Sequence, residues 1–161
     1  MTKGEQTRQK IIEATVALML SDTRASVSHI IKQAHVSRTT FYRHFPSLGD
    51  AILATTLTRF PTSYQSITDP AELLELVINT LDQDLAFFVH FSVYKEEFDF
   101  LFKQLFFKVA NNVQITLLDR TPVNDELVYR AISGIVAGWM TNTTTIKAAD
   151  VKGFIQQVLN L

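Results

Sequence analysis

The sequence has no cysteine, only five glycines and four prolines, and no long hydrophobic run. Without cysteine the chain forms neither disulfides nor thiolate zinc sites, which excludes a secreted disulfide scaffold. The longest stretch without a charged residue, 131–146, contains several hydroxyl and amide side chains and is too short to span a bilayer. The first ten residues lack an apolar signal core. We therefore expect a cytoplasmic protein that has no membrane partner.

Apolar residues make up 47% of the 161 positions, which is enough for a buried core. The net charge of −1 is unevenly distributed. Residues 1–50 contain seven Lys or Arg against four Asp or Glu, and the remainder contains eight against twelve. A basic N-terminal part favours polyanion binding by that part alone, although random scatter can also produce a difference of this size.

Hydrophobic residues recur with helical spacing along most of the chain, and no strand pattern stands out. We therefore expect an all-α fold, with a three-helix head at residues 1–48 and a helical body at residues 49–161. Thr7 is a candidate cap for the first helix. In the body we predict one long helix over 69–91, one over 95–118, one over 125–143 capped by Asn124, and a last one over 148–159.

Residues 26–45 have the spacing of a short helix, a tight corner and a second helix, as in a helix-turn-helix. Ser26 and Ser37 are good N-caps for the two helices. In the second helix Phe41 and Phe45 lie four positions apart and form a buried stripe, and the following proline ends the helix.

The opposite face of this second helix carries cations, hydroxyls and a phenol. Arginine can pair with a guanine edge, and the threonine methyl can pack on the thymine methyl. Tyrosine and histidine can donate to phosphates, which positions a helix without reading sequence. The face therefore favours DNA binding, although a solvated face of a small helical domain has the same spacing. Its members are Thr39, Thr40 and Arg43, flanked by Tyr42 and His44.

The segments TRQKIIEATVALML and SVSHIIKQAHVSRTTFYRHFPSLGDAIL resemble the DNA-binding head of the TetR (tetracycline repressor-like) transcriptional regulators. The likeness covers about residues 5–58, and its most specific parts are Ala-x-Val-Ser at 34–37 and Thr-x-Tyr-x-x-Phe at 40–45. The resemblance implies three groups of contacts: to bases by Arg38, Thr39, Thr40 and Arg43, to phosphates by Tyr42, His44 and Arg8, and to the DNA backbone by Ser26 and Ser28.

Two positions depart from the family pattern. The corner usually contains glycine, where this chain has His35, and we predict that His35 keeps a positive φ. The first turn of the fourth helix often carries Lys or Arg, where this chain has Leu48. One phosphate contact is then missing, so DNA affinity should be weaker or less sensitive to salt.

The body contains a phenylalanine cluster, with eight of the twelve phenylalanines between residues 87 and 107. Aromatic stripes at helical spacing are usually core, and the alternative is that they line a ligand pocket. Without a second histidine or a close acid pair nearby, a metal site has little support, and we expect no cofactor. The candidate ligand-binding residues are Phe87, Phe88, His90, Phe91, Phe98 and Phe102.

Gly134 and Gly138 lie four apart within a predicted helix. Because glycine destabilises a helix by about 1 kcal/mol, the pair suggests close approach by another helix, either from a subunit partner or from the chain's own core. The TetR resemblance implies an all-helical body that binds a small molecule and dimerises through its last two helices. The candidate interface residues are Gly134, Gly138, Val151, Phe154, Ile155 and Val158.

These observations predict a ligand-responsive transcriptional regulator, more specifically a repressor that binds a two-fold operator as a homodimer and responds to a small-molecule effector. The alternative is a TetR-like partner or co-activator that does not bind DNA, which the departures at His35 and Leu48 mildly favour. An enzyme is disfavoured, because the sequence shows no nucleophile–base pairing, phosphate loop or metal-ligand spacing.

Overall fold

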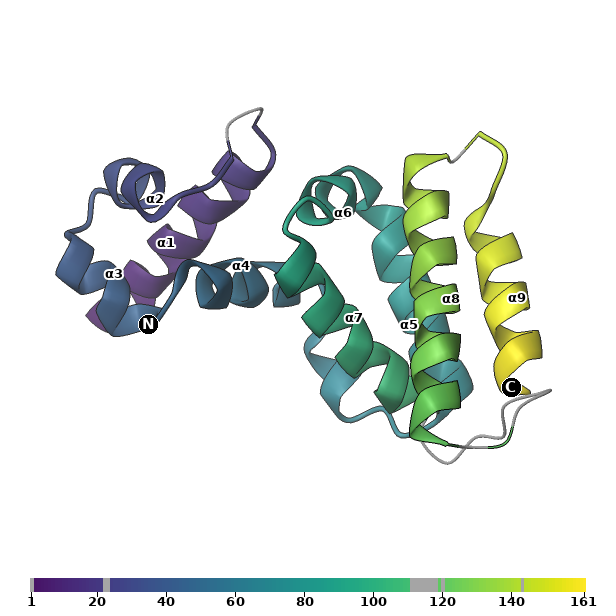
Figure 1. Ribbon diagram of the computed structural model, residues 1–161. Helices are drawn as coiled ribbons and strands as arrows, with labels where there is room; N and C mark the ends of the chain where they lie inside the picture. Colours follow the sequence, from purple (N-terminus) through teal and green to yellow (C-terminus); the bar gives the residue numbers. More distant parts are fainter. Residues whose placement is uncertain (1, 22–23, 111–118, 120, 143) are drawn as a thin grey trace. The chain divides into compact units, whose positions relative to one another are not determined.

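The computed structural model describes residues 2–21, 24–110, 119, 121–142 and 144–161 (Figure 1). Within these residues the regular structure is entirely helical, as predicted. The chain forms two compact units that divide between Arg59 and Phe60, which we call the N-terminal and C-terminal units.

The N-terminal unit contains the helices α1 (Lys3–Met19), α2 (Val27–Ala34), α3 (Arg38–His44) and α4 (Leu48–Leu57). Helix α1 packs against both α2 and α4. Helix α4 therefore goes with this unit, whereas the sequence placed the domain boundary after residue 48. The core draws on all four helices: Ile11, Ile12, Ala14, Ile30, Ala34, Phe41, Phe45 and Ala51.

Side-chain caps fix where these helices begin. The Ser26 hydroxyl accepts from the backbone N–H of His29, and the Ser37 hydroxyl accepts from that of Thr40, so both predicted caps are confirmed. The prediction for Thr7 is wrong, because α1 begins a turn earlier with Thr2 as its cap. The Thr7 hydroxyl instead donates back to the Lys3 carbonyl inside the helix.

The C-terminal unit begins with a short 3₁₀ turn, η1, followed by five helices. Helix α5 packs against α7 and α9, and α8 packs against α6, α7 and α9. Large side chains such as Leu81 and Trp139 fill the space between them. The elements are η1 (Thr62–Gln65), α5 (Pro70–Gln83), α6 (Leu85–Phe91), α7 (Lys95–Ala110), α8 (Pro122–Thr141) and α9 (Ala148–Leu159).

The predicted helix over 69–91 is wrong, because it breaks at Asp84, whose φ of −126° and ψ of 41° are not helical. An unbroken helix would carry Asp84 onto the face that buries Thr80 and Leu81, and a carboxylate there would lose its hydration. The break keeps Asp84 half-exposed.

Three further helices were predicted in the C-terminal unit, and their starts and ends can be compared with the structure. The cap of α8 is Thr121, whose hydroxyl accepts from the Asn124 N–H, so the helix begins at Pro122 and Asn124 is not its cap. A proline at the first helical position costs no hydrogen bond. The predicted helix over 95–118 is described as far as Ala110, and its remaining part, 111–118, lies outside the described residues. The last helix is confirmed at Ala148–Leu159.

Candidate nucleic-acid interface

The corner between α2 and α3 depends on His35. This residue has φ 53° and ψ 45°, the left-handed conformation that the sequence predicted. Its backbone N–H donates to the Ile31 carbonyl, and the Val36 N–H donates to the same carbonyl at 3.1 Å. The corner therefore closes α2 in the usual way, although histidine stands where glycine is favoured.

One side of α3 is fixed in the core. Phe41 and Phe45 are buried, and their ring centres lie 6.0 Å apart. The Arg8 guanidinium of α1 lies 5.1 Å from the centre of the Phe45 ring, so this cation is held beside the end of α3. These contacts fix the rotation of α3 about its own axis.

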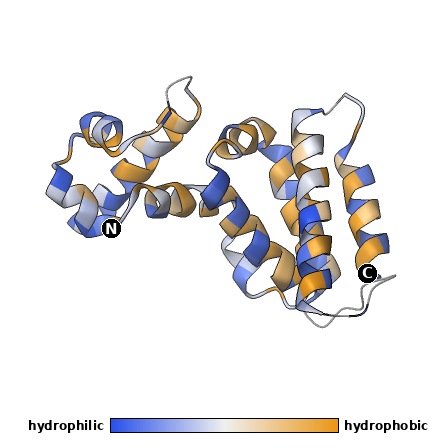
Figure 2. Cartoon of the chain, in the orientation of Figure 1, coloured by the Kyte–Doolittle hydropathy of each residue, from blue (hydrophilic) through white to orange (hydrophobic). Residues whose placement is uncertain are grey.

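The other side of α3 faces solvent. Arg38, Thr39, Tyr42 and Arg43 are exposed, and in Figure 2 the helix is mostly blue and white. Thr40 is half-buried, and its hydroxyl lies 2.9 Å from that of Ser37. The two predicted base-contacting cations, Arg38 and Arg43, are therefore both open to solvent, and Thr40 is tied to the helix cap.

The Arg38 side chain is supported by its neighbour one turn along. Its Nη2 donates to the Tyr42 hydroxyl at 3.4 Å, and its guanidinium carbon lies 5.5 Å from the Tyr42 ring centre. Each of these contacts is weak at an exposed site. Together they hold the Arg38 guanidinium beside the ring and the hydroxyl of Tyr42.

His44, predicted to contact a phosphate, is half-buried at the end of α3. Its Nε2 is buried and has no hydrogen-bond partner among the residues that the structure describes. A phosphate could thus be reached through Nδ1 only. On α2, Ser28 is exposed, whereas Ser26 is half-buried and its hydroxyl accepts the capping bond at 3.3 Å.

Leu48 has a packing role. It is half-buried and packs against the core of the N-terminal unit. An apolar side chain at this position therefore adds to the core and contributes nothing to a phosphate contact.

A comparison with protein families agrees with this geometry. Residues 11–48 match the family described as "Bacterial regulatory proteins, tetR family". The match spans α2, the corner at His35 and α3, which are the elements that form the exposed face. Over residues 11–48 this chain is thus similar to the tetR family. The N-terminal unit thus contains a helix-turn-helix similar to that of the tetR family, and a helical unit follows it in the sequence. This supports a DNA-binding transcriptional regulator.

Solved structures resemble the chain over most of its length. The dihydroxyacetone kinase operon activator DhaS is 18% identical with a TM-score of 0.52, over 96% of this chain and 92% of that one, which shows a shared fold. The fatty acid degradation regulator FadR from Bacillus halodurans is 18% identical with a TM-score of 0.47, over 99% and 95%. A transcriptional regulator from Rhodococcus sp. Rha1 is 14% identical with a TM-score of 0.49, over 99% of both chains. No curated protein matches the sequence.

The predicted ligand-binding phenylalanines are packed among the helices of the C-terminal unit. Phe87, Phe88 and Phe91 are fully buried. The Phe91 and Phe98 ring centres lie 5.6 Å apart, and Phe98 stacks on Phe102 at 4.2 Å. Of the predicted set, only Phe102 lines the apolar cavity between α5, α7, α8 and α9. His90 is half-buried on α6.

The predicted interface residues separate into two groups. Val151 and Ile155 are buried in the chain's own core, and Val158 is half-buried. Phe154 is 43% exposed, and a Cβ added at Gly134 or Gly138 would meet nothing within 4 Å. Sequence reasoning missed Leu127, which is exposed and continues the glycine face at the spacing i, i+7, i+11.

The described residues offer neither a membrane-spanning helix nor a metal-binding cluster. No helix among them is both long and apolar enough to cross a membrane. No group of three His, Asp or Glu side chains in this part of the chain is placed to hold a metal ion.

Proposed function

We propose that this protein is a ligand-responsive transcriptional repressor that acts in the cytoplasm and binds a two-fold DNA operator as a homodimer. The observation that carries the proposal is the division of α3 into two sides. Phe41 and Phe45 anchor one side in the core, and Thr39 and Arg43 face solvent on the other, while Arg38 is exposed in the first turn. A helix held in this way can enter a major groove without losing its packing.

In this proposal some exposed side chains contact bases and others contact the DNA backbone. Arg43 and Arg38 pair with base edges, because guanidinium can take guanine O6 and N7 together. Tyr42, Ser28 and Arg8 donate to the DNA backbone, which fixes the register of the helix. Because Leu48 packs inward, we expect one phosphate contact fewer than a cation at this position would give, and a salt slope that is smaller by about 0.9.

Homodimerisation is supported by the exposed face of α8. Gly134 and Gly138 have open space beside them, so the chain's own core gives no reason for two glycines in the helix. Close approach by a second copy of the chain would explain glycine at both positions. Two N-terminal units on a two-fold axis would then read half-sites about 34–36 Å apart or a multiple of that distance.

A second candidate is a TetR-like activator or partner protein. DhaS, which shares the fold, is described by its name as an operon activator. The left-handed His35 keeps the corner intact and so removes one reason to favour a partner that does not bind DNA. Leu48 still favours the partner protein, because its apolar side chain makes no phosphate contact. The exposed cations of α3 favour DNA binding in either case.

The test is selection of bound DNA from a random pool at low salt, followed by an electrophoretic shift. We expect enrichment of a two-fold symmetric sequence. Thr39→Glu places a carboxylate on the groove-facing side of α3 and should abolish the shift. Thr62→Glu, at an exposed position in η1, is the matched control and should leave it unchanged. Absence of any shift with wild type would favour the partner protein.

A further inference from the structure

An open groove follows the line where α1 and α2 of the N-terminal unit pack side by side (Figure 1). One part of the groove lies between Lys10 and His35, and the other part lies between Leu18 and His29. Gln33 and His35 line both parts, so the two are continuous. Their volumes of about 340 and 540 Å³ lie in the range of binding sites, about 300–1,000 Å³.

The groove has an apolar floor and a basic rim. Ala14 and Ala34 of the lining are buried and form the floor. Lys10 and Lys32 of the lining are exposed and lie at the rim. In the part of the chain that the structure describes, neither lysine takes part in an ion pair. Both ammonium groups are therefore open to a carboxylate from outside.

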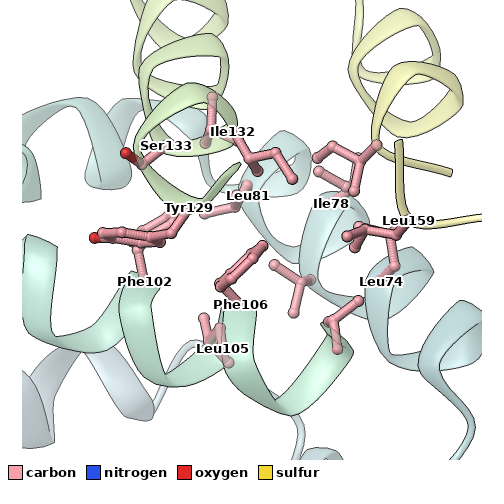
Figure 3. A pocket seen from close by; sticks show the side chains of 14 residues that line it. Leu74, Ile78, Leu81, Phe102, Leu105, Phe106, Tyr129, Ile132, Ser133 and Leu159 are labelled. Carbon is pink, nitrogen blue, oxygen red and sulfur yellow. The ribbon is translucent and has the colours of Figure 1, made fainter. Parts of the chain in front are cut away.

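The other polar side chains of the lining also suit an acidic partner. The imidazoles of His29 and His35 and the Gln33 amide can donate hydrogen bonds to carboxylate oxygens. The acid in the lining, Glu13, accepts from Gln9 Nε2 at 3.1 Å. By contrast, the apolar cavity of the C-terminal unit, shown in Figure 3, has no charged side chain in its lining. The groove of the N-terminal unit thus offers charge complementarity to an anionic partner.

We propose that this groove binds a short acidic segment of a partner protein. An apolar side chain of the segment packs over Ala14 and Leu18. Carboxylates on either side of it pair with Lys10 and Lys32. From Lys10 to Leu18 the groove follows α1 for about 12 Å, at about 1.5 Å per residue. An extended segment of about four residues spans that length.

DNA and small molecules fit the groove less well. DNA presents a row of phosphates without apolar side chains, so it would leave the floor at Ala14 uncovered, and Glu13 would repel the phosphates. A small molecule is normally bound with most of its surface buried. Along this groove the side chains of Lys10, His29 and Lys32 are exposed, so such a ligand would stay largely in water.

The groove is separate from the side chains predicted to contact DNA, because none of them lines it. On α2, His29 and Gln33 lie four positions apart on the stripe that faces the groove, whereas Ser28 is not part of the lining. A copy bound to DNA through α3 can therefore hold a partner protein at the same time. This inference adds partner recruitment to the proposed function and does not depend on the ligand response.

The probes are three five-residue peptides that are blocked at both ends and have a central leucine. The flanking residues are all glutamate in the first peptide, glutamine in the second and lysine in the third. NMR signals of the histidine imidazoles follow binding to the full-length protein at neutral pH. The glutamate peptide should shift His29 and His35 and leave His44 of α3 and His90 of α6 unchanged. The glutamine peptide should bind at least about fivefold more weakly, and the lysine peptide should not bind.

Matched charge reversals locate the site. Lys10→Glu with Lys32→Glu should abolish binding of the glutamate peptide. Lys3→Glu with Lys95→Glu makes the same change in net charge at exposed positions outside the groove and should not. Lys10→Gln with Lys32→Gln removes the charges without reversing them and should weaken binding at least about fivefold. This neutral variant keeps the test valid if the reversal fails to fold.

Equal binding of the glutamate and glutamine peptides, or equal loss in the two double reversals, would overturn the proposal. So would no binding of the glutamate peptide. If the reversal at Lys10 and Lys32 then also costs more than about tenfold in operator affinity, the groove is a DNA contact. A changed sedimentation coefficient of that variant would make the occupant a second copy of this chain. Peptide binding is measured without DNA, so its failure and a failure of DNA binding are distinguishable.

Discussion

The Arg38 guanidinium lies against the Tyr42 ring, 5.5 Å from its centre, and its Nη2 donates to the Tyr42 hydroxyl at 3.4 Å. The ring supports the cation through its face, and the hydroxyl is the only part of Tyr42 that can donate to a phosphate. Removal of the hydroxyl therefore takes away the phosphate donor and the 3.4 Å hydrogen bond, and leaves the support that the ring face gives Arg38.

Tyr42→Phe should weaken binding of all DNA sequences about equally, by about fivefold to tenfold, because a phosphate contact carries no sequence information. Arg43→Ala should instead cost about 1–3 kcal/mol on the preferred operator and relax base preference at one position of each half-site. Affinities for an operator and for its point variants measure both effects. Identical changes in base preference for the two variants would contradict the division of roles.

His35→Gly should raise the free energy of unfolding by about 0.5–1 kcal/mol, because glycine relieves the strain of the left-handed backbone. His35→Val should lower it by more than about 1 kcal/mol. Gln33→Gly, two residues earlier at an exposed position of α2, is the control and should lower it by about 1 kcal/mol. Urea unfolding gives all three values, and stabilisation by valine would disprove the argument.

Gly134→Glu should give folded monomers. A Cβ at this position would meet nothing within 4 Å inside one chain, so we expect the variant to fold, whereas a carboxylate at a close helix contact between copies is strongly unfavourable. Sedimentation should show a dimer for wild type and for Gln104→Glu, an exposed control on α7. A dimer that survives Gly134→Glu would place the interface elsewhere.

Tyr129 should make the protein less stable in alkali. Burial and the hydrogen bond to Asp99 raise the pKa of its phenol well above the ordinary value. Below about pH 10 both states keep the proton. Above it the unfolded state loses the proton first, so stability falls by up to about 1.4 kcal/mol per pH unit. Tyr129→Phe should lose this part of the slope above pH 10 in urea unfolding series. An unchanged slope would show that Tyr129 does not titrate as described.

Local chemistry made much of the N-terminal unit predictable. Ser26, Ser37 and the left-handed His35 act within three or four residues of themselves, so the sequence alone contains their partners. The spacing of Phe41 and Phe45 likewise determines which side of α3 is buried. Thr7 was misread because Thr2, with Glu5 completing a capping box, begins the helix earlier.

The C-terminal unit was harder to predict because its contacts join residues far apart in sequence. The break at Asp84 is set by which face of α5 meets α7 and α9, and periodicity does not report that. The phenylalanine run suggested a pocket, yet most of the cavity lining is aliphatic and comes from four separate helices. Only the folded chain brings Leu74, Val109 and Leu159 to one place.

Lys108 of α7 holds the 3₁₀ turn at the start of the C-terminal unit. Its ammonium donates to the carbonyls of Tyr64 and Gln65, both at 2.8 Å, and lies 5.5 Å from the Tyr64 ring centre. The 3₁₀ turn that follows α4 is in this way fastened to α7, next to the cavity residue Val109. Neutralising this one amine, by acetylation for example, would remove both hydrogen bonds and release the turn from α7.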